Sequence, residues 1–94
     1  MDKQTRLKFK ELKKLLDLNR LSILEMLIDR ETCVCEIVRK TGLKHNLVSH
    51  HLKVLSDLDY ITSDKQGLHV LYSLIKDKSD NVIKLFNFIN EHYE

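Results

Sequence analysis

Apolar residues recur at steps of three and four in four successive segments of the first sixty residues. This spacing is typical of amphipathic helices, because it places the apolar side chains on one face. We therefore predict four helices, of which the fourth runs from about Lys44 to Leu58. The apolar positions are Leu7, Phe9, Leu12, Leu15 and Leu16, then Leu21, Ile23, Leu24, Leu27 and Ile28, then Val34, Ile37 and Val38, and finally Leu47, Val48, Leu52, Leu55 and Leu58.

Few residues mark the ends of these helices. Proline is absent and glycine occurs only at Gly42 and Gly67, so each glycine predicts a turn. Gly42 would end a third helix that begins near Thr32, because glycine readily adopts the positive φ of a helix C-terminus. Asn19 is the expected N-cap of the second helix.

The last third of the chain changes pattern. Residues 60–62 and 70–74 predict two strands, joined by a polar turn at Gly67. Residues 77–93 predict a closing helix, with Asp77 and Ser79 as candidate caps. The predicted fold class is therefore mainly α with a small β-hairpin, in the order of a winged helix-turn-helix (α-α-α-α-β-β-α).

Length and composition favour one domain over residues 1–94. The chain is 43% hydrophobic and 32% charged, as in globular proteins. A domain of this size buries only about 60% of the surface that its unfolded chain exposes, so a second copy would enlarge a thin core. The apolar stripes at Leu12 and Leu15 and at Phe86 and Ile89 call for such cover, and we expect a homodimer.

No apolar run approaches the roughly 20 residues that span a bilayer, and the first residues lead into no signal-peptide core. We expect a cytoplasmic protein without a membrane partner.

The exposed face of the fourth helix carries groups that can read double-stranded DNA. In a helix-turn-helix the second helix enters the major groove, where lysine can donate to guanine and asparagine can pair with adenine. The wing residues Lys65 and Gln66 would contact phosphate. An ordinary polar surface helix remains an alternative on periodicity alone. The candidate reading residues are Lys44, His45, Asn46, Ser49, His50 and Lys53.

Two passages, residues 31–37 (ETCVCEI) and 48–55 (VSHHLKVL), resemble the ArsR/SmtB family of metal-responsive winged-helix repressors. With the wing residues 60–61 and 72–74, the resemblance covers residues 19–74. It implies a homodimer built from the first and last helices, which represses from a dyad-symmetric operator until an inducer arrives. The chain departs from the family at Lys44, where relatives often carry a serine cap.

Cys33 and Cys35 resemble the cysteine pair with which some family members bind thiophilic ions. Arsenite, cadmium, lead and copper(I) are the candidate ions, because thiolates are soft ligands. Side chains two apart on a regular helix diverge by about 200°, so the sulfurs would converge only at an irregular helix start or across subunits. Two residues apart is also too close for an easy intrachain bridge, so in a reducing cytosol we expect thiols or ligands. Val38 stands where arsenite-type members have a third cysteine. The third ligand could come from water, an exogenous thiol, or a histidine or carboxylate such as Glu36.

Other functions remain open. Both cysteines could simply pack in the core, or could sense redox state between subunits. The chain shows no glycine-rich phosphate loop, and little beyond composition supports an enzyme. The remaining alternatives are a metal-independent winged-helix regulator and a protein-interaction module on the same fold.

Overall fold

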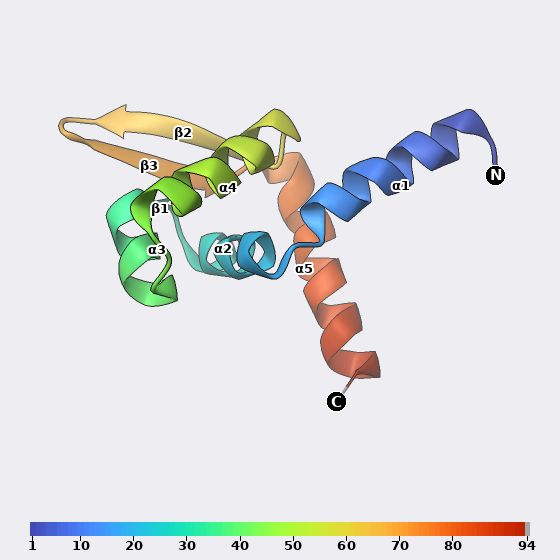
Figure 1. Ribbon diagram of the computed structural model, residues 1–94. Helices are drawn as coiled ribbons and strands as arrows, with labels where there is room; N and C mark the ends of the chain where they lie inside the picture. Colours follow the sequence, from blue (N-terminus) through green and yellow to red (C-terminus); the bar gives the residue numbers. More distant parts are fainter. Residues whose placement is uncertain (94) are drawn as a thin grey trace.

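The computed structural model describes residues 1–93 and contains five helices and one three-stranded antiparallel sheet (Figure 1). The elements in chain order are α1 (Lys3–Leu15), α2 (Leu18–Asp29), β1 (Thr32–Cys33), α3 (Val34–Thr41), α4 (His45–Asp57), β2 (Ile61–Gln66), β3 (His69–Leu74) and α5 (Lys76–His92). The predicted winged helix-turn-helix is confirmed, and the reading helix has the expected bounds to within one residue.

The core lies where α2, α3 and α4 meet beneath the sheet. Its apolar side chains come from the faces that the helical spacing predicted, and burying each of the large ones contributes about 1.5–3 kcal/mol. Val82 is the fully buried contribution of α5. The other core residues are Leu15, Ile23, Leu24, Leu27, Ile37, Val48, Leu52, Leu55 and Ile61.

The short strand β1 was not predicted. Its residues pair with β3, Thr32 opposite Tyr72 and Cys33 opposite Leu71, which gives the sheet the order β1-β3-β2. The prediction that the third helix begins near Thr32 is therefore wrong by two residues. Two residues are too few to show a periodicity. The strand forms only through its pairing with β3, about forty residues further along the chain.

Both glycine predictions hold. Gly42 ends α3 with φ +71°, and its N–H donates to the carbonyl of Val38. Gly67 has φ +63° in the turn of the wing, where the strands extend further toward the tip than predicted.

Three expected caps differ. Asp17 rather than Asn19 caps α2, because its Oδ1 accepts from the N–H groups of Asn19 and Arg20. Helix α5 begins after Ile75, and neither Asp77 nor Ser79 caps it.

Helix α1 stands away from the rest of the chain, and Figure 1 shows its N-terminal end far from the other elements. Only Leu15 of this helix is buried. Leu7 and Phe9 are more than half exposed, so much of the apolar face of α1 has no cover within its own chain. Within residues 1–93, no helix is both long and apolar enough to cross a membrane.

Candidate DNA interface and cysteine pair

Helices α3 and α4 form the helix pair that presents the candidate reading face. The turn at Gly42 and Leu43 leads to Lys44, which is the N-cap of α4 and makes no side-chain capping bond. Val48, His51, Leu52 and Leu55 fix the inner face of α4 in the core. All six predicted reading residues are exposed, as the opposite face of such a helix requires.

These six side chains are not all equally free. Lys53 forms an ion pair with Asp57 at 3.2 Å, one turn further along α4. His50 borders a surface hollow of about 520 Å³ between α4 and the end of α1, together with Lys14 of α1. The side chains of Lys44, His45, Asn46 and Ser49 form no hydrogen bond or ion pair with other described residues. The exposed N-terminal half of α4 is therefore available to base edges.

The wing places Lys65 and Gln66 at its exposed tip, on the strand end next to Gly67. Gln66 donates to the carboxylate of Asp64 at 3.2 Å, while Lys65 has no ion-pair partner in the described chain. A lysine at such a tip suits a phosphate contact.

His51 holds α4 against the start of α2. It is 5% exposed, and its Nδ1 lies 3.1 Å from an Arg20 guanidinium nitrogen. Its Nε2 lies 3.5 Å from the side-chain amide of Asn19. Arg20 also donates from Nε to the carbonyl of Lys14 at 2.6 Å, so one side chain links the ends of α1, α2 and α4. A guanidinium can only donate, so the shorter contact with Arg20 assigns Nδ1 as the acceptor of a neutral ring and puts the ring proton on Nε2, which then makes no hydrogen bond with the amide nitrogen of Asn19.

The electrostatics of this cluster agree with its geometry. Burial lowers the pKa of His51, and the nearby charge of Arg20 and the neighbouring His50 add to this, although Asp17 acts in the opposite direction. Burial alone would raise the pKa of Asp17, but the N–H of Arg20, its charge and the N–H of Asn19 together lower it. Sequence reasoning missed this cluster. Arg20 meets His51 across 31 residues, whereas the cap by Asp17 is a local contact that the sequence analysis assigned to Asn19.

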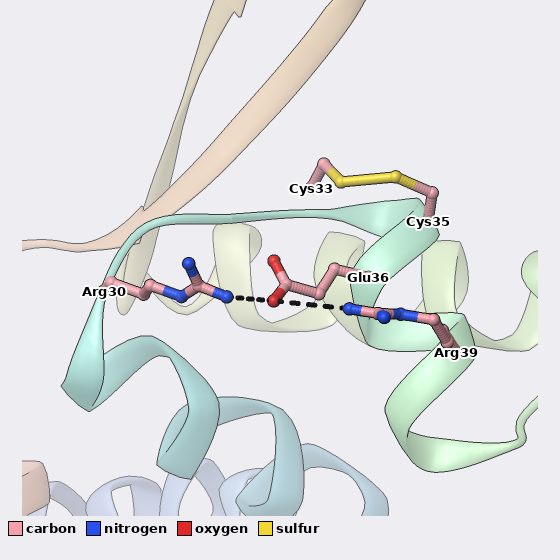
Figure 2. The surroundings of a disulfide bond; sticks show 5 residues. All are labelled: Arg30, Cys33, Cys35, Glu36 and Arg39. Carbon is pink, nitrogen blue, oxygen red and sulfur yellow. Dashed lines mark hydrogen bonds and ion pairs between the residues drawn. A yellow bond between two sulfur atoms is a disulfide. The ribbon is translucent and has the colours of Figure 1, made fainter.

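Cys33 and Cys35 form a disulfide (Figure 2), contrary to the expectation of two thiols. The physical reason is that Cys33 is not helical. It is the N-cap of α3, with φ −89° and ψ 162°, so its side chain does not follow the helical wheel. The two Cα atoms are 5.4 Å apart, inside the usual range for a disulfide. The irregular helix start that convergence requires is therefore present within one chain.

The surroundings of the pair supply no further ligand. Figure 2 shows Glu36, the candidate third ligand, between the guanidinium groups of Arg30 and Arg39, and it forms ion pairs with both. Nowhere in residues 1–93 do three or more His, Cys, Asp or Glu side chains gather as a metal site would require. Once reduced, the two cysteines would offer the soft sulfur donors that thiophilic ions prefer, but they fall short of a complete ligand set.

Comparison with known proteins agrees with this architecture. The family profile described as bacterial regulatory protein, arsR family, matches residues 17–63. The arsenical resistance operon repressor of Staphylococcus aureus is 35% identical over 79 residues, which cover 84% of this chain and 76% of that protein.

Solved structures share the fold over nearly the whole chain. HlyU from Vibrio cholerae matches with a TM-score of 0.80 and 27% identity, covering 94% of this chain and 97% of its own. A homodimeric winged helix-turn-helix DNA-binding domain from Mycobacterium bovis matches with a TM-score of 0.82 and 21% identity, covering 98% and 90%.

The profile spans the helix-turn-helix and the first residues of the wing, which are the parts that the sequence resemblance rested on. The chain therefore belongs to the ArsR/SmtB family of winged-helix transcriptional regulators, and it is not an enzyme.

Proposed function

We propose that this chain is a repressor that binds a dyad-symmetric operator as a homodimer and reads it with the exposed face of α4. The observation that carries the proposal is that face itself, whose polar and basic side chains stand opposite a fully packed apolar face. The reading residues are Lys44, His45, Asn46, Ser49, His50 and Lys53, with Lys65 and Gln66 as phosphate contacts.

Uncovered apolar surface on the terminal helices supports the dimer. A groove of about 340 Å³ runs between the end of α1, α2 and α5, lined by Leu16, Leu18, Phe86 and Ile89 among others. Phe9 on α1 and Phe88 on α5 are both more than half exposed. A second copy that covers these faces would place two reading helices on one duplex. Because bacterial DNA lies in the cytoplasm, we also propose that the protein acts there.

We further propose that the reduced Cys33 and Cys35 pair is where an inducing ion acts. The relative in Staphylococcus aureus is an arsenical resistance repressor, and the two sulfurs of this chain are held close together. Bound there, arsenite, cadmium, lead or copper(I) would be held by soft thiolates. The remaining ligand would come from water or an exogenous thiol.

DNA binding is tested by fluorescence anisotropy on a duplex from the protein's own promoter. Replacing Ser49 and His50 with alanine removes two reading side chains without disturbing the core, so affinity should fall about tenfold or more. Ser56→Ala, exposed at the far end of α4, is the control and should bind as the parent chain does. Equal affinity of the double variant and the parent would refute the assigned face.

The same assay tests the ion. Protein reduced with a phosphine should release DNA on titration with one of the four ions, whereas oxidised protein and a Cys33→Ser/Cys35→Ser variant should not. Tight binding that no ion changes would identify a metal-independent regulator, with a structural cysteine pair. Failure of the reduced parent chain to bind any duplex would instead favour the protein-interaction module.

A further inference from the structure

Five of the six basic side chains of α1 lie along one side of the helix. Successive residues of an α-helix are about 100° apart, and on that wheel the five fall within an arc of about 100°. We call this face the basic stripe. It consists of Lys3, Arg6, Lys10, Lys13 and Lys14.

The segment that carries the stripe has a larger net positive charge than the whole chain. Residues 1–16 contain six of the sixteen Lys and Arg residues but only two of the fourteen Asp and Glu residues, a net charge of +4. Because the whole chain carries +2, the remainder carries a net −2, although it contains the reading helix and the wing. Affinity for a duplex depends strongly on neutralised phosphates, and the reading face alone supplies few of the charges needed.

The charges of the stripe are not used within the chain. All five side chains are exposed, and the ion pairs found in residues 1–93 join Arg30 and Arg39 to Glu36 and Lys53 to Asp57. The stripe is therefore a solvated row of cations without internal partners.

The other side of α1 is apolar. Phe9, Leu12 and Leu16 lie on the side of the wheel away from the stripe, where the proposed dimer would cover them. Lys8 is the one basic residue on this apolar side. A dimer that covers the apolar side would leave the stripe in solvent.

The stripe begins beside the reading helix. Lys14 borders the same hollow as His50 of α4, and from there α1 leads away from the body of the chain (Figure 1). Lys3 and Lys14 are eleven residues apart, which is about 16 Å along a helix. A duplex carries one phosphate charge per about 1.7 Å, so this length matches roughly nine phosphate charges.

We propose that the basic stripe of α1 is a second DNA-binding surface, which contacts the phosphate backbone beside the groove that α4 occupies. The inference rests on the proposed function, since it concerns the same duplex. On this proposal α1 contributes affinity that does not depend on the DNA sequence, whereas α4 recognises the bases.

The test compares two triple variants that lose the same charge. Lys3→Gln/Arg6→Gln/Lys10→Gln removes three cations of the stripe, and Lys76→Gln/Lys78→Gln/Lys84→Gln removes three cations of α5. Glutamine and lysine have similar helix propensities, so both should remain folded. Sedimentation velocity confirms that each is still a dimer before binding is measured by anisotropy between about 50 and 300 mM salt.

Each lost phosphate contact makes the slope of log K against log salt shallower by about 0.9, and a dimer has six of the substituted side chains. For the stripe variant, the slope should become shallower by at least about two. Its affinity at about 100 mM salt should fall at least tenfold, by the same factor on operator and scrambled duplexes. The control variant should stay within about one of the parent slope.

Three results would overturn the inference or its basis. Equal slopes for the two variants would reject the stripe as a DNA surface and leave the reading helix intact. Binding of the parent chain to phosphatidylserine vesicles, lost in the stripe variant while the DNA slope is unchanged, would assign the stripe to membranes. No binding of the parent chain to any duplex would refute the proposed function itself.

Discussion

Acid should loosen the attachment of the reading helix through His51. In the folded chain the ring accepts a hydrogen bond from Arg20 and is buried, and both features require its neutral form. The groups around it are Asp17, Arg20 and His50, and burial is the largest cause of its lowered pKa. In the unfolded chain the same ring takes up a proton near its ordinary pKa of 6.5.

The sign of the effect follows from these two states. Above pH 6.5 the ring of His51 is neutral in both the folded and the unfolded chain, so its titration does not change the free energy of unfolding. Below pH 6.5 the unfolded chain binds a proton that the folded chain does not, so the free energy of unfolding falls by up to about 1.4 kcal/mol per pH unit, until the folded pKa is reached. The carboxylate of Asp17, whose pKa is lowered from 3.8, loses its contribution only at a more acid pH. The window from pH 7.5 to 5.5 therefore isolates the histidine.

Urea unfolding at fixed protein concentration measures this loss. His51→Gln keeps an acceptor for Arg20 but cannot titrate, so it should be less stable than the parent at pH 7.5 and nearly independent of pH down to 5.5. His50→Gln, the exposed neighbour, should keep the parent pH dependence. If His51→Gln lost as much stability as the parent chain between pH 7.5 and 5.5, His51 would not be the titrating group.

Three further changes test the packing that positions the interface. Leu52→Ala removes a side chain that is 1% exposed and should cost about 2–5 kcal/mol in urea unfolding, whereas Leu47→Ala, at 37% exposed, should cost under about 1.5 kcal/mol. Asp17→Ala removes the N-cap of α2 and should lower the free energy of unfolding by about 1 kcal/mol. A decrease of less than about 0.3 kcal/mol would show that the cap is not needed. Gly42→Ala should lower the melting temperature, because the position has φ +71° and open space around it, so an L side chain adds only backbone strain of about 1–2 kcal/mol. No change in melting temperature would contradict the assigned turn.

The sequence predicts those parts of the molecule that local rules govern. The buried positions Val48, Leu52 and Leu55 follow from helical spacing, and the turn at Gly42 follows from the φ that glycine tolerates. The exposed reading face is then fixed as the opposite side of the same helix. These predictions hold because neighbours within one or two turns decide them.

The strand that was missed depends on a contact between distant segments. Strand β1 exists because Thr32 and Cys33 pair with β3, and this pairing also takes Cys33 out of the helix and turns its sulfur toward Cys35. Side chains two residues apart diverge within a regular helix, but Cys33 lies just outside α3. Glu36, by contrast, looks like a free ligand in the sequence but is held in the fold by two near neighbours, Arg30 and Arg39.

Arg20 connects the two surfaces proposed to meet DNA. Its guanidinium holds the carbonyl of Lys14, at the end of the basic stripe, and the ring of His51, on the buried side of the reading helix. Leu15 is the only residue of α1 buried in the core. The side chain of Arg20 therefore makes the main polar contact between α1 and the rest of the chain. A dimer contact that shifts α1 must therefore strain or break the Arg20 contacts before it can move independently of α4. We therefore expect Arg20→Ala to weaken DNA binding in the anisotropy assay although Arg20 lies outside the reading face, and unchanged affinity would show that α1 is held in place without these contacts.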